Sequence, residues 1–245
     1  MRKYALLAAL AASMFLVVAI AFGADNTQTA KFTVTKTKAG TKLNPRSTGI
    51  TTDLNNTGTD PSPAKLVVLH FDKNLVFGGA NFPSCTLAKS TRNACPANTR
   101  VGSGQANART GPSSTIDLKI TAFNGPGGKS LLLALRGAIP VDLEAKLSRD
   151  SGLFGTKLTT VVPKATYNAA PGFFTPLVKF LAIIPARTIR KSGKTRPFIG
   201  LTGCTGGKLK FRAEFTWASK TDAAGNVTKP APPKLTINQT QRCTR

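Results

Sequence analysis

Glutamate and histidine are nearly missing from this chain of 245 residues. The only glutamates are Glu144 and Glu214, and the only histidine is His70. Because long amphipathic helices usually contain more glutamate than this, the shortage argues against a helical protein. A serine or cysteine nucleophile would depend on His70 alone as its base, and no G-x-S-x-G sequence is present. His70 stands between Leu69 and Phe71 in a strand-like apolar run, so we interpret it as a packed or edge-strand residue.

Acidic residues are also scarce. The chain has 10 aspartates and glutamates against 34 lysines and arginines, which gives a formal net charge of +24. No aspartate-rich loop suited to calcium occurs, and the cysteines lack the C-x-x-C spacing typical of zinc sites. We therefore expect no metal site and no cofactor.

Tryptophan and tyrosine are rare as well. After residue 24 the only ones are Tyr167 and Trp217, and Trp217 falls on the apolar side of an alternating segment. Proteins that bind single-stranded nucleic acid interleave the bases with exposed aromatic side chains. The sequence therefore argues against nucleic acid as a partner and gives no support to a lectin.

Residues 1–24 have the features of an export signal. Two basic residues precede an uncharged apolar stretch, which ends on Ala21 and Gly23 at the spacing a signal peptidase requires, directly before polar residues. We predict a signal peptide over residues 1–24 and a secreted or cell-surface protein. The alternative is an uncleaved N-terminal membrane anchor through residues 4–23, which are long enough to cross a hydrocarbon layer of about 30 Å. No later stretch is long enough, so we expect no integral membrane span after cleavage.

Short strands separated by glycine and proline account for most of the remaining chain. From Lys208 to Trp217 apolar and polar residues alternate with a period of two, which predicts a strand with one face in the core. We predict an all-β protein, an antiparallel β-sandwich of the jelly-roll or immunoglobulin-like type with about ten strands. Residues 25–63, rich in Thr, Asn and Pro, should form an N-terminal strand and loops. Residues 64–245 should form the main β-sandwich, with 25–245 as one domain.

Three segments are apolar on both faces of a strand, namely 66–71, 131–135 and 177–184. Such runs are typical of strands that are covered on both sides. We therefore expect these three strands to be buried.

Four cysteines allow three disulfide pairings, and the sequence alone does not choose among them. We predict Cys85 with Cys95 and Cys204 with Cys243, because each bridge closes a local segment rich in turn residues. Loops of these sizes correspond to about 3 and 4 kcal/mol in the chain-entropy description.

The order of several motifs is familiar. An "FP-C" segment at residues 82–85 is followed by a "CP" at Cys95 and a "VGxG-A" strand at 101–106, and Cys204 precedes a glycine-rich turn and the alternating strand. In this the chain resembles a group of uncharacterised, exported, β-rich bacterial proteins, mostly actinobacterial. The resemblance covers roughly residues 66–243 and implies a fold and a location, but no activity.

The positive charge is unevenly distributed. No acidic residue occurs between Asp150 and Glu214, and a loop in this interval is especially basic, with Arg187, Arg190, Lys191, Lys194 and Arg196. One interpretation is a site for polyanions such as anionic cell-wall polymers or lipid headgroup surfaces. The other is a charge that keeps an exported protein soluble, without a selected ligand. The sequence leaves both open, together with the oligomeric state.

Asp142 and Glu144 are the one carboxylate pair that could support catalysis. At positions i and i+2 of a strand they would share a face roughly 7 Å apart, as the acid and nucleophile of some jelly-roll glycosidases do. The place two residues before Asp142 is Pro140, where such enzymes usually carry a further Glu. A solvated face balanced by Lys146 is the simpler interpretation.

These observations predict a non-enzymatic secreted or cell-surface protein that binds anionic envelope polymers or other polyanions through the basic loop. The alternative is a secreted glycan hydrolase of jelly-roll type that uses Asp142 and Glu144.

Overall fold

The structure, a computed structural model, describes residues 26–111 and 114–245. The predicted signal peptide, residues 1–24, lies outside the described residues. None of the helices in the described ranges has the length and hydrophobicity to cross a bilayer.

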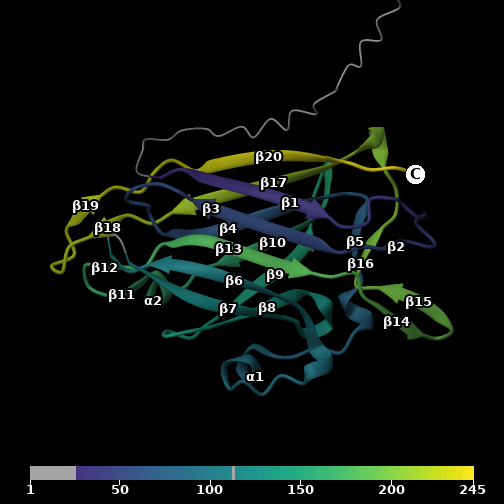
Figure 1. The fold of residues 1–245 in the computed structure, drawn as a ribbon, viewed down its shortest axis with the longest axis horizontal. Helices are drawn as coiled ribbons and strands as arrows, with labels where there is room; N and C mark the ends of the chain where they lie inside the picture. Colours follow the sequence, from purple (N-terminus) through teal and green to yellow (C-terminus); the bar gives the residue numbers. More distant parts are fainter. Residues whose placement is uncertain (1–25, 112–113) are drawn as a thin grey trace, which may run out of the picture.

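Eleven antiparallel strands form one continuous sheet (Figure 1). In their order across the sheet they are β1 (Gln28–Val34), β3 (Ile50–Asn56), β13 (Leu177–Ile184), β6 (Arg100–Arg109), β7 (Thr115–Asn124), β8 (Ser130–Arg136), β9 (Val141–Arg149), β10 (Phe154–Val161), β4 (Ala64–Asp72), β17 (Lys208–Trp217) and β20 (Leu235–Arg242).

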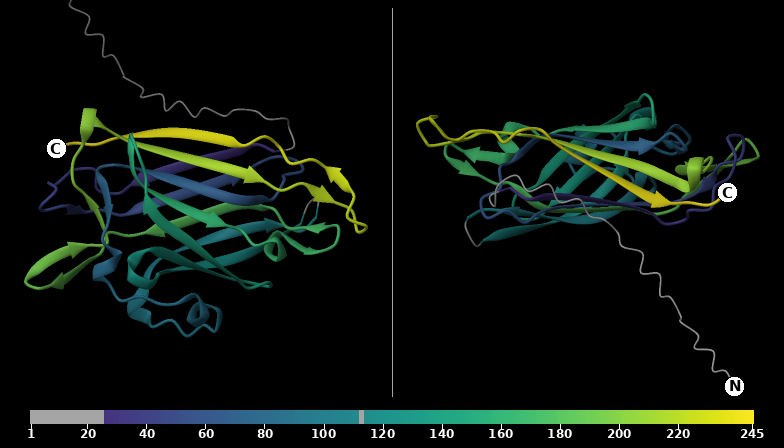
Figure 2. Two further views of the ribbon diagram at one scale, coloured as in Figure 1. Left: turned by 180° about the vertical axis from the view of Figure 1, so that it is seen from behind. Right: turned by 90° about the horizontal axis from the view of Figure 1, so that it is seen from above.

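The sheet folds over so that its two halves face each other as layers (Figure 2). Phe32 of β1 stacks on Phe211 of β17 with ring centroids 5.1 Å apart, and these strands lie near opposite ends of the strand order. The predicted all-β antiparallel β-sandwich is therefore confirmed, with eleven strands in the main sheet where about ten were expected.

Two glutamine side chains join the edges of this sheet. The side-chain amide of Gln239 on β20 accepts from the Phe32 N–H at 2.6 Å and donates to the Phe32 carbonyl at 2.9 Å. Gln241 repeats the arrangement with Val34, at 2.7 and 2.9 Å. Each side-chain amide thus makes the two hydrogen bonds that the backbone of a neighbouring strand would make to β1. The exposed edge of β1 is covered in this way without a further strand.

Strand β17 shows why the sequence folds in this way. Its inward residues Leu209, Phe211, Ala213, Phe215 and Trp217 are buried, while the residues between them are exposed or half-buried, as the period of two predicts. Strands β6 to β10 follow each other as a meander, because short turns join neighbouring antiparallel strands.

Strands β1 and β3 lie within residues 25–63 and pair with each other over their full length. Strand β3 then pairs with β13 from the later part of the chain. The N-terminal segment is thus continuous with the main sheet.

The three apolar runs differ in outcome. Strand β8 is buried on both faces: Leu133 points inward, and its neighbour Leu132 is fully buried on the outer side, where helix α1 (Leu87–Thr91) packs. Strand β4 is partly covered on its outer side. The expectation was wrong for β13, whose outer face meets solvent, since Ile183 is 40% exposed.

Both disulfides are the predicted ones, Cys85–Cys95 and Cys204–Cys243. The first closes the segment that carries α1, and the second ties the start of β17 to the end of β20.

Short strands, a short helix and 3-10 turns lie at the two ends of the sandwich. They are the sheet of β2 (Arg46–Ser47), β16 (Ile199–Leu201) and β5 (Leu75–Phe77), the hairpins β11 (Asn168–Ala170) with β12 (Phe173–Phe174), β14 (Thr188–Lys191) with β15 (Lys194–Pro197) and β18 (Lys220–Thr221) with β19 (Val227–Lys229), the helix α2 (Lys164–Tyr167), and the 3-10 turns η1 (Gly79–Asn81), η2 (Ala97–Thr99), η3 (Pro126–Gly128) and η4 (Thr205–Gly207). Hairpin β14–β15 projects from one end, and α2 with β11–β12 lies at the other (Figure 1).

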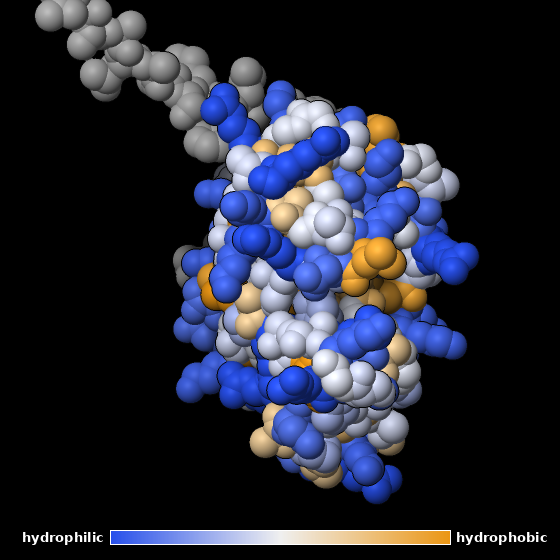
Figure 3. All heavy atoms as spheres, turned by 90° about the vertical axis from the view of Figure 1, so that its right-hand side faces the viewer, coloured by the Kyte–Doolittle hydropathy of each residue, from blue (hydrophilic) through white to orange (hydrophobic). Residues whose placement is uncertain are grey.

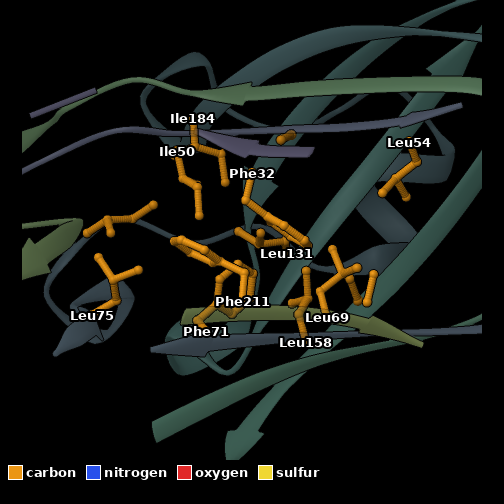
Figure 4. Close-up of a cluster of buried hydrophobic side chains, with 14 of the residues drawn as sticks. Phe32, Ile50, Leu54, Leu69, Phe71, Leu75, Leu131, Leu158, Ile184 and Phe211 are labelled. Carbon is orange, nitrogen blue, oxygen red and sulfur yellow. The ribbon is translucent and has the colours of Figure 1, made fainter. Parts of the chain in front are cut away.

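Four phenylalanine rings fill the interior near the end from which β14–β15 projects. We call them the aromatic cluster: Phe32, Phe71, Phe77 and Phe211. In Figure 4 Phe32 lies against Phe71 and Phe211, with Ile50 and Ile184 above them.

Candidate functional site

The basic loop predicted from the sequence is a regular hairpin. Strands β14 and β15 pair through Thr188 with Pro197 to Lys191 with Lys194. Ser192 and Gly193 form the turn with φ of +50° and +72°, the backbone of the two-residue turns that match the twist of a hairpin. We call this element, with Arg187 at its base, the basic hairpin.

Pairing in the hairpin gathers positive charge on one of its faces. Lys191 is directly opposite Lys194, and Arg196 follows two residues later, so the three side chains share a face. Like charges at directly opposed positions destabilise a strand pair. None of the three makes an ion pair with an acidic side chain of residues 26–111 or 114–245. The face is therefore an uncompensated cationic surface.

The other two predicted residues have different places. Arg190 is paired with Thr195 and lies on the opposite face of the hairpin. Arg187 precedes β14, and its carbonyl accepts from Phe198 N–H at 2.9 Å and from the Ser47 hydroxyl at 3.2 Å. The structure thus brings three of the five residues onto one face.

A hollow of about 690 Å³ lies at the same end of the molecule. Lys42, Arg46 and Arg245 line it, together with the uncharged polar residues Asn44 and Asn74. The Ser47–Arg187 hydrogen bond connects β2, which carries Arg46, to the base of the hairpin. In Figure 3, which views the molecule from this side, hydrophilic residues are spread over the whole face, with apolar residues between them.

The ends of three long strands add more positive charge here. Lys208 at the start of β17 pairs directly with Arg242 at the end of β20, and Lys73 follows β4. Exposed lysines also occur on other parts of the surface, for example Lys31 and Lys119. The cationic character is therefore general, with its densest part at the hairpin end.

Asp142, the first candidate catalytic carboxylate, is held by other side chains. It accepts from the Ser90 hydroxyl at 2.5 Å and from Arg136 at 3.0 Å, and its side chain is only 11% exposed. Arg136 also donates to the Ser90 carbonyl and to Asn93, so the pair fastens α1 onto β8 and β9. The partner of this carboxylate is thus Arg136, and not Lys146 as the sequence suggested.

Glu144 lies two residues further along β9 on the same outer face and is half-buried. It makes no hydrogen bond or ion pair within the described residues. The two carboxylates therefore share a face, as predicted, but only one of them is free to act on a substrate.

His70 belongs to an ionic cluster that the sequence did not reveal. Strand β4 lies between β10 and β17, so His70 is buried within the sheet and is not an edge residue. Its Nδ1 is 2.5 Å from Asp150, and its Nε2, which has no hydrogen-bond partner in the part of the chain that the structure describes, is 3.6 Å from Glu214. Lys234 contacts the other oxygen of Glu214 at 2.7 Å. We call these four residues the histidine cluster.

Both carboxyl groups of the histidine cluster have lowered pKa values. Burial acts to raise the pKa of Asp150, but hydrogen bonds from His70 and the Ser151 backbone outweigh it. Burial also acts to raise the pKa of Glu214, but the hydrogen bond and the positive charge of Lys234 outweigh it. Among residues 26–111 and 114–245, no serine, threonine or cysteine is hydrogen-bonded to His70, so the arrangement resembles a structural ion network more than a nucleophilic site.

Within the described residues no group of three or more His, Cys, Asp or Glu side chains is arranged to hold a metal ion. Comparisons with protein families, curated proteins and solved structures find no match to this chain. The resemblance to exported bacterial proteins stays a prediction.

Proposed function

We propose that this chain is a non-enzymatic, secreted or cell-surface protein that adheres to anionic polymers of a cell envelope, or to anionic lipid headgroups, through the basic hairpin. The observation that carries the proposal is the face formed by Lys191, Lys194 and Arg196, where like charges are opposed and the described residues supply no acidic partner. An anion that bridges these side chains relieves their repulsion, which no acidic side chain of the described residues does.

The neighbouring hollow enlarges the surface available to a polymer. Lys42 and Arg46 continue the positive charge from the hairpin across the same end. A flexible polyanion can contact both areas at once, so that many weak contacts combine. Salt weakens each contact, because the Debye length is about 8 to 10 Å at near-physiological ionic strength.

Export is supported by two features. The sequence predicts a signal peptide over residues 1–24, and the chain forms two disulfides, which persist in oxidising compartments. Anionic envelope polymers are accessible from that side of the membrane.

The alternative, a glycan hydrolase that uses Asp142 and Glu144, has weaker support. A catalytic carboxyl must be free to exchange a proton with the substrate, whereas Asp142 is fastened by Arg136 and Ser90. Loss of a measured glycan hydrolysis in both Asp142→Asn and Glu144→Gln would nevertheless establish the hydrolase.

The test compares two triple variants that remove the same charge. Lys191→Gln, Lys194→Gln and Arg196→Gln change the cationic face, while Lys31→Gln, Lys65→Gln and Lys119→Gln change exposed lysines on β1, β4 and β7. Binding to immobilised polygalacturonate and to vesicles with anionic lipid is measured at increasing salt. We expect the hairpin variant to lose about tenfold in affinity and the control variant less than about threefold.

Equal losses in the two variants would show that only net charge matters, and the site assignment would be wrong. Binding that does not weaken from about 50 to 500 mM salt would contradict an electrostatic mechanism.

A further inference from the structure

The two layers of the sandwich enclose a cavity of about 150 Å³. Inward-facing residues of eight main-sheet strands line it, from β3 and β13 across the meander to β4. It begins beside Phe71 and Phe77 of the aromatic cluster and extends toward the opposite end of the molecule. A cavity of this size in an apolar interior is large enough for benzene or a short alkyl chain.

The lining is hydrocarbon, with a few hydroxyl groups. No charged side chain contributes to it among the described residues. Its only polar members are Thr52, Thr160, Thr166, Tyr167 and Thr175. Such a lining repels ions and accepts an apolar molecule that carries at most a neutral polar end.

The cavity reaches the surface at one end. Two of its lining residues, Ile139 and Leu177, are 43% and 38% exposed. Three of its hydroxyl residues, Thr166, Tyr167 and Thr175, lie beside them in the segment that carries α2 and precedes β13. Within this segment the Thr175 hydroxyl donates to the Thr166 carbonyl at 2.9 Å. Three of the five hydroxyl residues are therefore gathered at the mouth, and the rest of the lining is hydrocarbon apart from Thr52 and Thr160.

Small residues keep the cavity open. Ala64, Ala108, Ala122 and Ala182 all face it, at positions where a larger aliphatic side chain would occupy the space. Interiors are normally packed with few voids larger than a water molecule. The same sandwich is filled by phenylalanine rings a short distance away, so its geometry does not prevent dense packing.

We propose that this cavity binds the hydrocarbon chain of a neutral amphiphile, with the chain inside and the polar end at the mouth between Ile139, Tyr167 and Leu177. The mouth lies at the end of the molecule with α2, and the basic hairpin projects from the other end (Figure 1). The two sites are therefore separate, and neither depends on the other.

Straight-chain alcohols are the probes. Each methylene that enters the cavity strengthens binding by about fourfold, the equivalent of roughly 0.8 kcal/mol. We expect the affinity, measured by calorimetry below the concentration at which the alcohols aggregate, to rise with chain length and to level off at roughly six to eight carbons. An affinity that continues to rise for longer chains would indicate adsorption to the surface and overturn the proposal.

The wild-type protein provides an internal control in β8. Leu133 faces the cavity, and its neighbour Leu132 is buried on the opposite side of the same strand. In methyl NMR spectra, saturating alcohol should shift the signals of Leu133 and leave those of Leu132 almost unchanged. Equal shifts of the two residues would contradict binding inside the cavity.

A matched pair of variants completes the test. Ala122→Leu places three additional carbons in the cavity, while Ala224→Leu adds them at an exposed turn. We expect the first to reduce hexanol affinity by more than about tenfold and the second to have no effect. Normal binding by folded Ala122→Leu would overturn the proposal, and the NMR comparison still decides the matter if this variant does not fold.

Discussion

The aromatic cluster and the cavity occupy the same sandwich interior and share strand β4, but they are filled differently. At the end with the basic hairpin, the rings of Phe32, Phe71 and Phe211 interlock, and Phe32 and Phe211 stack almost parallel at 9°. Beside Phe71 and Phe77 and on toward the end with α2, mainly aliphatic and alanine side chains surround about 150 Å³ of space. The interior is thus densely packed where the strands carry phenylalanine, and it can receive a ligand where they carry aliphatic and alanine side chains.

The difference has an energetic consequence. Cavity volume reduces stability by about 24 cal/mol per Å³, so an empty space of 150 Å³ corresponds to roughly 4 kcal/mol. Stacked and edge-on ring pairs add about 0.5 to 1.5 kcal/mol each beyond burial. The aromatic cluster should therefore carry a larger share of the stability per residue, and the residues around the cavity should tolerate truncation better.

The largest expected effect compares a leucine beside the aromatic cluster with a leucine that borders the cavity. Leu209 is fully buried near the aromatic cluster and does not border the cavity, whereas Leu133 does. We expect Leu209→Ala to cost about 4 to 5 kcal/mol of the free energy of unfolding and Leu133→Ala about 3, because Leu133 has fewer packing partners to lose. Urea unfolding with both disulfides intact measures the two values.

The comparison is made with the protein free of any added alcohol, because a bound ligand would restore contacts to Leu133. Equal losses for the two variants would mean that the cavity collapses around the truncated side chain. The contrast between the two ends would then be absent in solution.

An effect of intermediate size is expected where the sheet edges are joined. Gln239→Leu and Gln241→Leu remove the side-chain amides that bond Phe32 and Val34 of β1. Each change leaves a backbone N–H and a carbonyl without their partners, which should cost about 1 to 3 kcal/mol. Hydrogen exchange should become faster at the Phe32 and Val34 amides.

Gln105→Leu serves as the control, since Gln105 is exposed on β6 and its side chain makes no hydrogen bond to another described residue. Because the joined edges lie beside Phe32, the variants test whether closure stabilises the aromatic cluster. Unchanged exchange at Phe32 and Val34 would show that the glutamine contacts do not persist in solution.

Local patterns in the sequence were sufficient for much of this fold. The alternation over residues 208–217 identified β17 with its bounds, and turn-rich spacing identified both disulfides. The hairpin that carries Lys191 and Lys194 was also found, as a basic loop, because its residues are close in sequence.

Features that depend on strand register could not be predicted in the same way. His70, Asp150 and Glu214 come from or adjoin three strands that are far apart in the sequence, and only the pairing of β4 with β10 and β17 brings them together. Likewise, Ser90 meets Asp142 across 52 residues. The exposed outer face of β13 was missed because hydrophobicity in a single strand does not reveal whether anything covers it.

The smallest expected effect is a difference in how two groups of surface ion pairs contribute to folding stability at low pH. Asp150 and Glu214 are nearly enclosed beside His70, on the reverse side of the strand that carries Phe71. Asp60, just before β4 at the end with α2, is 57% exposed and is contacted by Lys220 and Lys229. Burial tends to raise the pKa of Asp60, but the hydrogen bonds from the two lysines lower it overall.

All three carboxyl groups have pKa values lower in the folded protein than their ordinary values. Each therefore stabilises the fold when the pH is above its unfolded pKa, and the stabilisation is lost as the pH falls through the folded pKa, from about pH 5 downward. Exposed ion pairs contribute little because solvent screens them. Asp150→Asn should therefore clearly reduce the decrease in the free energy of unfolding at low pH, and Asp60→Asn should hardly change it. Urea unfolding between about pH 7 and pH 3 checks this order, and an equal or larger effect of Asp60→Asn would show that enclosure beside His70 does not strengthen the Asp150 contact.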